Sequence, residues 1–141
     1  MTSEKTDYLF VYSSLLRGFG TPDYEYICRY FDFAGTARAR GILSIMGDII
    51  VGTPVEDERF IVGELYRIQQ PELFSFVIGQ LDEYEGLHPE PPEVSKYKRV
   101  QSVVYTDDGE EKLAWVYWYA GGVHGLPVIE SGDVLEYLNR K

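Results

Sequence analysis

The chain has little cysteine and lacks a long apolar run near its start. Cys28 is the single cysteine among 141 residues, so no intramolecular disulfide can form, which is typical of a reducing compartment. Residues 1–7 are polar and charged, and the apolar stretch after them is too short and too aromatic for a signal peptide or a membrane span. The sequence therefore predicts a cytoplasmic protein with no membrane association.

Basic residues are also scarce. The chain has 13 Lys and Arg against 23 Asp and Glu, which gives a formal net charge of -10. This balance argues against nucleic acid and against an anionic membrane surface, because both are bound mainly through Lys and Arg. It does not exclude an anionic small molecule held in a local pocket, so a carboxylate substrate remains possible.

Sequence motifs for nucleotides and metals are missing. There is no GxGxxG, Walker loop, HExxH or CxxC, so neither a nucleotide enzyme nor a metal enzyme has support, and we expect no metal and no cofactor. No internal repeat or low-complexity segment is visible either. A length of 141 residues fits one domain spanning residues 1–141, with enough chain to bury a core.

Apolar periodicity predicts clustered strands and few helices. Helices are expected from Thr21-Pro22 through Phe31, from Pro71 through Leu81 and from Ser131 through Leu138. Strands are expected at 8–12, 33–45, 49–51, 60–68, 97–105 and 112–119, the last two joined as a hairpin by Asp107-Asp108-Gly109. This order favours an α+β fold with a mixed sheet curled toward a barrel.

Two short motifs could carry chemistry. Tyr12-Ser13-Ser14-Leu15 ends the first predicted strand, and Leu81-Asp82-Glu83-Tyr84-Glu85-Gly86 ends the helix that Pro71 begins. A small-residue loop after a strand, joined by one carboxylate from a distant helix end, can form a compact acid/base site. The plain alternatives are that Glu85 is a solvated acid and that the serines satisfy loop backbone groups.

Aromatic residues alternate along the last predicted strand. Trp115, Tyr117 and Tyr119 are spaced by two and so share one face. Aromatic residues on one face usually belong to the core, and the sharper alternative is that they form the wall of a pocket.

The ordered set of motifs resembles the γ-glutamylcyclotransferase-like superfamily, which includes the avirulence-induced-gene-like proteins. Tyr12-Ser13-Ser14-Leu15 is similar to its Tyr-Gly-Ser/Thr-Leu loop, and Gly63-Glu64-Leu65-Tyr66 to its Gly-x-Leu/Val-Tyr strand. The segment 81–86 is similar to its Leu-Asp-x-aromatic-Glu-Gly segment, and Trp115-Val116-Tyr117 matches its aromatic strand. The order and spacing agree over roughly residues 8–120.

The resemblance implies a small mixed β-barrel with peripheral helices and a pocket. It implies Glu85 as the catalytic acid/base, Tyr12, Ser13, Ser14 and Leu15 as the loop that binds the substrate carboxylate, and Tyr117 in the same pocket. The implied reaction converts a γ-glutamyl compound to 5-oxoproline and a free amine, without metal or cofactor. Ser13 replaces the family glycine, and this departure leaves open a non-catalytic small-ligand binding protein on the same barrel. The resemblance implies nothing about oligomeric state.

Overall fold

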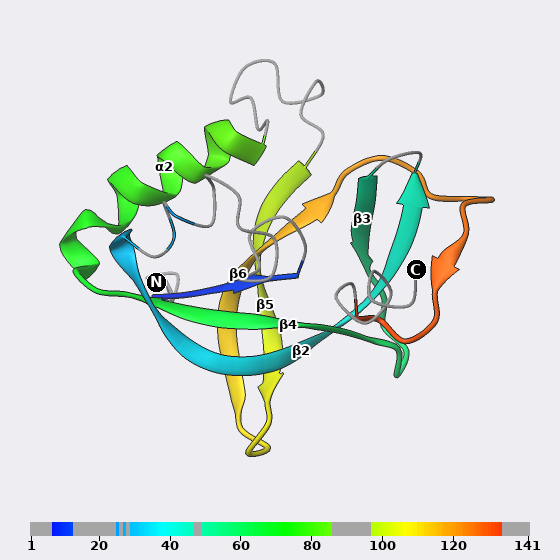
Figure 1. Ribbon diagram of the computed structural model, residues 1–141, viewed down its shortest axis with the longest axis horizontal. Helices are drawn as coiled ribbons and strands as arrows, with labels where there is room; N and C mark the ends of the chain where they lie inside the picture. Colours follow the sequence, from blue (N-terminus) through cyan, green and yellow to red (C-terminus); the bar gives the residue numbers. More distant parts are fainter. Residues whose placement is uncertain are drawn as a thin grey trace, which may run out of the picture.

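The computed structural model describes residues 7–12, 25, 27, 29–46, 49–85 and 97–133, with the backbone alone for residues 49 and 83–85. Residues 25, 27, 29 and 30 are helical. The remaining elements, in chain order, are β1 (Tyr8–Val11), β2 (Phe31–Met46), β3 (Ile49–Pro54), β4 (Phe60–Ile68), the 3-10 turn η2 (Pro71–Leu73), α2 (Phe74–Glu85), β5 (Tyr97–Thr106), β6 (Glu111–Tyr119) and β7 (Val128–Ile129) (Figure 1).

Five strands close into a mixed barrel. Strand β1 pairs with β4 in antiparallel and with β6 in parallel orientation, β4 pairs with β2, β2 with β5, and β5 with β6. The β2–β5 pairing, which matches Ala37 with Thr106 and Ala39 with Val104, completes the ring. The predicted α+β fold with a small mixed barrel is confirmed.

The first part of strand β2 belongs to the barrel, and its second part belongs to a smaller sheet. Residues 31–40 pair with β4, whereas residues 41–46 pair with β3, and Leu43 and Ser44 also pair with β7. The prediction of a helix through Phe31 is wrong at its end. Phe31 is buried and begins β2, where it pairs with Ile68. The spacing misled the prediction, because a residue buried four positions after Ile27 fits a helical pattern even where the chain is already extended.

Strand β4 passes very close to β1, and Gly63 makes this possible. A β-carbon on Gly63 would lie 2.6 Å from Cζ of Phe10, a buried residue of β1. The same β-carbon would come closer still to the backbone carbonyl oxygen of Val11. A side chain at this position would therefore displace the adjoining strand, which gives a physical reason for the glycine in the Gly-x-Leu-Tyr segment.

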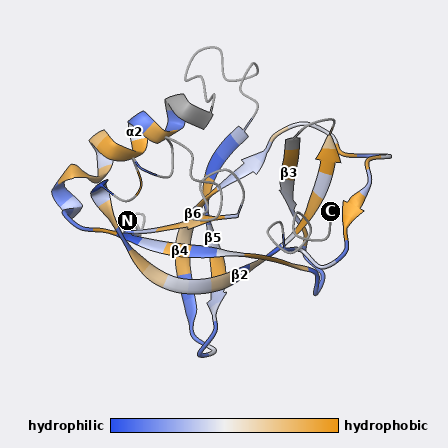
Figure 2. Ribbon diagram, viewed as in Figure 1, coloured by the Kyte–Doolittle hydropathy of each residue, from blue (hydrophilic) through white to orange (hydrophobic). Residues whose placement is uncertain are grey.

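Helix α2 packs on the sheet with one apolar stripe. Pro71 begins the helical region, as predicted, because its fixed φ suits a first helical position. Val77, Ile78 and Leu81 are buried, whereas Phe76 is exposed, and burial of a side chain such as Leu81 contributes about 1.5–3 kcal/mol. Figure 2 shows this mixture of hydrophobic and hydrophilic residues along α2. Among the described helices, none combines the length and the apolar character that a bilayer crossing requires.

The β5–β6 hairpin turns at the predicted glycine. Gly109 has φ +88°, which side-chain-bearing residues rarely adopt, and the Thr106 backbone N–H donates to Glu110 across the turn. The resulting register places Arg99 opposite Tyr117. Two residues far apart in the sequence are thereby brought side by side on the barrel wall.

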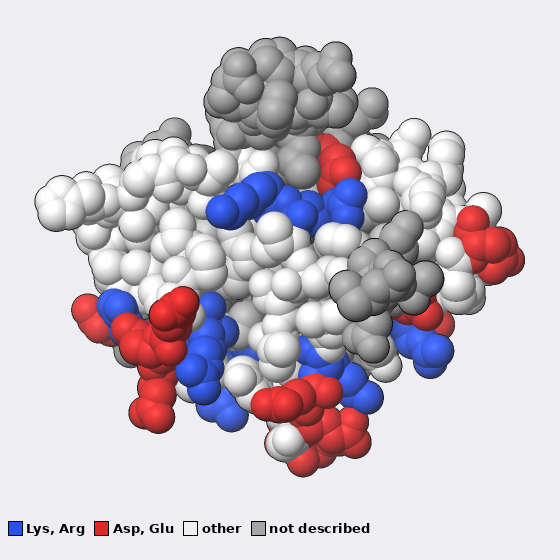
Figure 3. Space-filling model, turned by 180° about the vertical axis from the view of Figure 1, so that it is seen from behind, with Lys and Arg blue, Asp and Glu red and all other residues white. Residues whose placement is uncertain are grey.

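Charged side chains are mixed on the face that Figure 3 presents. Acidic side chains gather toward its lower edge with basic side chains among them, and a short row of basic side chains lies higher on the face, beside an acidic one.

Candidate active site

Tyr12 is held firmly at the end of β1. Its hydroxyl donates a hydrogen bond of 2.5 Å to the backbone carbonyl of Tyr117, and its ring stacks against Trp118 with centroids 5.9 Å apart. Strand β3 contributes Gly52, where a β-carbon would lie 2.6 Å from Cε2 of Tyr12. The residue that introduces the predicted substrate loop is therefore buried and fixed on three sides.

Tyr117 also reaches helix α2 through its hydroxyl. The hydroxyl donates a hydrogen bond of 2.7 Å to Oδ1 of Asp82, and Tyr117 itself is buried. A single residue of β6 thus binds Tyr12 with its backbone and the last turns of α2 with its side chain. The end of β1 and the end of α2 are joined through one residue.

Asp82 has a second partner in β5. Nε of Arg99 lies 2.8 Å from Oδ1 of Asp82, and a terminal nitrogen of the same guanidinium lies 3.1 Å from Oδ2. The guanidinium also lies over the Trp115 ring, 4.6 Å from its centroid. This paired geometry fixes both the carboxylate plane and the guanidinium plane.

Glu85 is the last residue of α2 and follows Asp82 by three positions. Residues with this spacing lie on the same helix face. The Glu85 side chain and the loop residues Ser13, Ser14 and Leu15 lie outside the described part of the chain. The convergence of residues 12–15 with the Glu85 carboxylate therefore stays a prediction.

A second carboxylate, that of Glu64, is buried in β4. Its Oε1 accepts a hydrogen bond of 2.9 Å from the Tyr66 hydroxyl. The register pairs Glu64 with Val11, the residue directly before Tyr12. Glu64 thus lies beside the strand end that leads into the predicted substrate loop.

The register of the aromatic strand agrees with the predicted alternation. Trp115 stacks with Phe74, the first residue of α2, and Tyr117 bonds Asp82 of the same helix. Trp118 instead stacks with Tyr12 and points toward Gly41 of β2. Trp115 and Tyr117 therefore form the side of β6 that contacts α2, and Trp118 belongs to the other side.

Sequence reasoning missed Arg99, and it assigned no role to Asp82 within its motif. The signal for Arg99 was available, because a tight turn at residues 107–109 sets a register that places residue 99 opposite Tyr117. The signal for Asp82 was weaker. A single aspartate on a helix is usually solvated, and its burial follows from tertiary packing alone.

Two hollows open among the described residues, with volumes of about 300 and 280 Å³, and neither is lined by Tyr12, Asp82 or Tyr117. The larger is lined by residues of β2, β4 and the segment around β7, and the smaller lies near the tip of the β5–β6 hairpin. The candidate active site is therefore defined by the hydrogen bonds that join Tyr12, Tyr117 and Asp82.

Two exposed carboxyl groups have lowered pKa values. Hydrogen bonds from the Arg59 side chain lower the pKa of Asp57, and a hydrogen bond from the Thr106 hydroxyl lowers the pKa of Asp108. Among the residues the structure describes, no three of the His, Cys, Asp and Glu side chains are grouped so that they could hold a metal ion.

Comparison with known proteins shows which family the chain resembles. Residues 9–136 match the model of the family described as "Gamma-glutamyl cyclotransferase, AIG2-like". The chain is 32% identical over 133 residues to the "Putative gamma-glutamylcyclotransferase" of Methanocaldococcus jannaschii, covering 93% of this chain and 98% of that protein.

Solved structures share the fold. YkqA of Bacillus subtilis superposes with a TM-score of 0.68 at 24% identity, over 97% of this chain and 44% of that one. A structure titled "Gamma-glutamyl cyclotransferase" superposes with a TM-score of 0.55 at 16% identity, over 96% of this chain and 86% of that one. At these identities the likeness establishes the barrel fold only.

Proposed function

Because this chain belongs to the AIG2-like γ-glutamyl cyclotransferase family, we propose that it converts a γ-glutamyl amine, amino acid or peptide to 5-oxoproline and the free amine. Glu85 is the general acid and base of this proposal. Tyr12, Ser13, Ser14 and Leu15 bind the substrate carboxylate through their backbone N–H groups. Tyr117, whose hydroxyl is already bonded to Asp82, lines the site with its ring.

The proposed reaction is intramolecular. The α-nitrogen attacks the γ-carbonyl carbon, a five-membered ring closes, and the bond from that carbon to the leaving nitrogen breaks. Two protons leave the α-nitrogen and two arrive at the leaving nitrogen, which departs as an ammonium. One carboxylate that alternately takes and returns a proton can carry them. Since nucleophile and electrophile belong to one molecule, correct positioning supplies much of the rate enhancement.

The observation that carries the proposal is the double attachment of Tyr117. Its carbonyl binds Tyr12 at 2.5 Å, and its hydroxyl binds Asp82 at 2.7 Å, one helical turn before Glu85. This arrangement supports a site in which the loop after β1 and the end of α2 serve the same ligand. A reducing, cytoplasmic location and a small-molecule substrate are consistent with the single cysteine and the net charge of -10.

The test is incubation of the purified protein with a panel of γ-glutamyl amines, amino acids and peptides, followed by measurement of 5-oxoproline. We expect release from at least one compound in the wild type and release that is about 10²–10⁴-fold slower in Glu85→Gln. Absence of 5-oxoproline with every compound would contradict the proposal.

The alternative is a non-catalytic binding protein, and Ser13 is the observation that favours it. A serine in place of the family glycine adds a side chain and restricts φ, which can narrow the pocket or tilt the N–H donors of the loop. Calorimetric binding of γ-glutamyl ligands without turnover would support this alternative. Gain of turnover in Ser13→Gly would identify the serine as its cause.

A further inference from the structure

Three side chains from three elements meet beneath the end of α2. Asp82 of α2 accepts hydrogen bonds from Arg99 of β5 at 2.8 and 3.1 Å and from the Tyr117 hydroxyl of β6 at 2.7 Å. We call this group, Asp82, Arg99 and Tyr117, the helix clamp. The side chains of Arg99 and Asp82 are only 21% and 22% exposed, so solvent screens the pair much less than it would a surface pair.

The start of α2 also contacts β6, but through stacked aromatic rings. The Phe74 ring stacks on Trp115, with centroids 6.3 Å apart, and Arg99 lies over the same Trp115 ring. Helix α2 therefore contacts β6 at two places, through an aromatic stack at its first residue and through the clamp near its last turn. The aromatic contact and the apolar stripe hold the helix against the sheet.

Apolar packing alone does not fix the rotation of a helix about its axis. Hydrophobic contacts are non-directional, whereas a paired carboxylate–guanidinium contact has one favourable geometry. A carboxylate about 6 Å from the axis moves about 2 Å when the helix rolls by about 20°. Since a displacement of about 1 Å can cost about 10²-fold in rate, roll is a property that a catalytic helix must control.

We propose that the helix clamp sets the roll of α2 and thereby the position of Glu85, which makes Asp82, Arg99 and Tyr117 positioning residues for the reaction. The effect on catalysis rests on the proposed function. The control of helix rotation by the clamp does not depend on that function. Asp82 and Glu85 are separated by less than one turn, so any rotation at Asp82 carries Glu85 with it.

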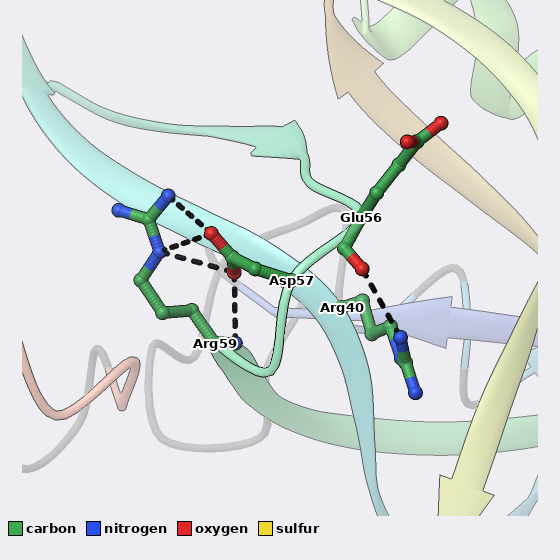
Figure 4. A network of polar contacts seen from close by, with 4 residues as sticks. All are labelled: Arg40, Glu56, Asp57 and Arg59. Carbon is green, nitrogen blue, oxygen red and sulfur yellow. Dashed lines mark hydrogen bonds and ion pairs between the residues drawn. The ribbon is translucent and has the colours of Figure 1, made fainter.

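The chain supplies a matched control. Asp57 and Arg59 form the same kind of paired contact on the turn between β3 and β4, with Nε–Oδ1 at 3.1 Å and a terminal nitrogen 2.7 Å from Oδ2 (Figure 4). Their side chains are 53% and 57% exposed. Asp57→Asn therefore removes the same chemistry from a place where no helix depends on it.

The first measurement is amide hydrogen exchange on the full chain, for Asp82→Asn, Tyr117→Phe and Asp57→Asn. We expect faster exchange at the amides of residues 83–85 in the first two variants, with the β1–β4 amides unchanged, and wild-type rates throughout in Asp57→Asn. Tyr117→Phe removes only a hydroxyl, so it decides the question if Asp82→Asn does not fold. Unchanged exchange at residues 83–85 in Tyr117→Phe would overturn the clamp.

The second measurement is the kinetics of the same variants on a substrate that the wild type accepts. In Asp82→Asn and Tyr117→Phe we expect kcat to fall about 10–100-fold, the usual effect of removing a group that orients a catalytic residue, with KM within about two-fold. In Asp57→Asn we expect both kcat and KM to stay at their wild-type values. In a Glu85→Gln background, Asp82→Asn should lower the residual rate by less than about two-fold, because effects that act through one residue do not add.

The outcomes separate the two proposals. If Asp82→Asn lowers the rate by the same factor in the wild type and in Glu85→Gln, the positioning role is overturned, since Asp82 would then act independently of Glu85. A change in KM alone would overturn it as well. A wild type that releases no 5-oxoproline would overturn the proposed function, and the exchange measurement would still decide whether the clamp holds α2.

Discussion

The backbone carbonyl of Tyr117 accepts a hydrogen bond from the hydroxyl of Tyr12, a residue 105 positions earlier in the chain. The bond joins β6 to the end of β1 at the point where the predicted substrate loop begins. Strands β1 and β6 are also paired in parallel, with Leu9 opposite Trp115. The loop therefore starts from a backbone that is fixed by the sheet and by a side chain together.

Tyr12→Phe tests this attachment. The substitution keeps the ring on Trp118 and Gly52 but removes the hydroxyl, and we expect the free energy of unfolding to fall by about 1 kcal/mol. If the loop binds substrate, a similar loss in binding raises KM about five-fold while kcat changes less. Urea denaturation and steady-state kinetics measure the two effects. Tyr105→Phe removes a hydroxyl from a tyrosine of β5 whose ring packs against Phe60, and it should leave KM unchanged. An unaltered KM in both variants would show that Tyr12 takes no part in binding.

Glu85→Gln tests the catalytic assignment. Gln resembles Glu in shape but cannot take up and return a proton at neutral pH, so we expect the rate of 5-oxoproline release to fall about 10²–10⁴-fold or more. Thermal melts should show the same fold stability as the wild type.

Glu83→Gln is the matched control, because it makes the same change two residues earlier in the same turn. Its rate should stay close to that of the wild type. If the two variants lose activity equally, the loss reflects the charge of the helix end, and Glu85 has no special role.

Gly63→Ala tests the close approach of β4 to β1. The added β-carbon would clash with the backbone carbonyl oxygen of Val11 as well as with Cζ of Phe10, so one strand must shift, and overpacking of this kind costs about 1–3 kcal/mol. Gly79→Ala adds the same carbon to the exposed side of α2, with nothing within 4 Å, and should stabilise the protein by roughly 0.5–1 kcal/mol. We expect the urea midpoint of unfolding to fall in Gly63→Ala and to rise in Gly79→Ala. Equal shifts in the two variants would contradict the packing described for Gly63.

Local patterns predicted most of the elements but not the contacts between them. Apolar alternation found β1, β4 and both strands of the hairpin, and Pro71 marked the start of the helical region correctly. Closure of the barrel through β2 and β5 has no local signal, because pairing partners are chosen by the whole fold. The predicted helix after Ser131 begins with a turn at residues 130–131, and its residues from 134 onward lie outside the described part of the chain.

The candidate site shows the same division. Tyr12, Tyr117 and Glu85 were proposed from motifs, and the structure brings Tyr12 and Tyr117 together. Arg99 and the burial of Asp82 depend on the packing of α2 against β5 and β6, which no window of the sequence contains. Residues that hold a site in place are therefore harder to predict than the motif residues themselves.

The position of β1 between β4 and β6 has a consequence for how the protein is made. Strand β1 is synthesised before both of its partners, β4 and β6, the second of which follows more than 100 residues later. Until β6 emerges, the newly made β1 offers an unpaired and strongly apolar edge, and such edges invite pairing with other chains. A chain cut before β6 would keep this edge permanently, so the last strand of the barrel also protects the first from aggregation.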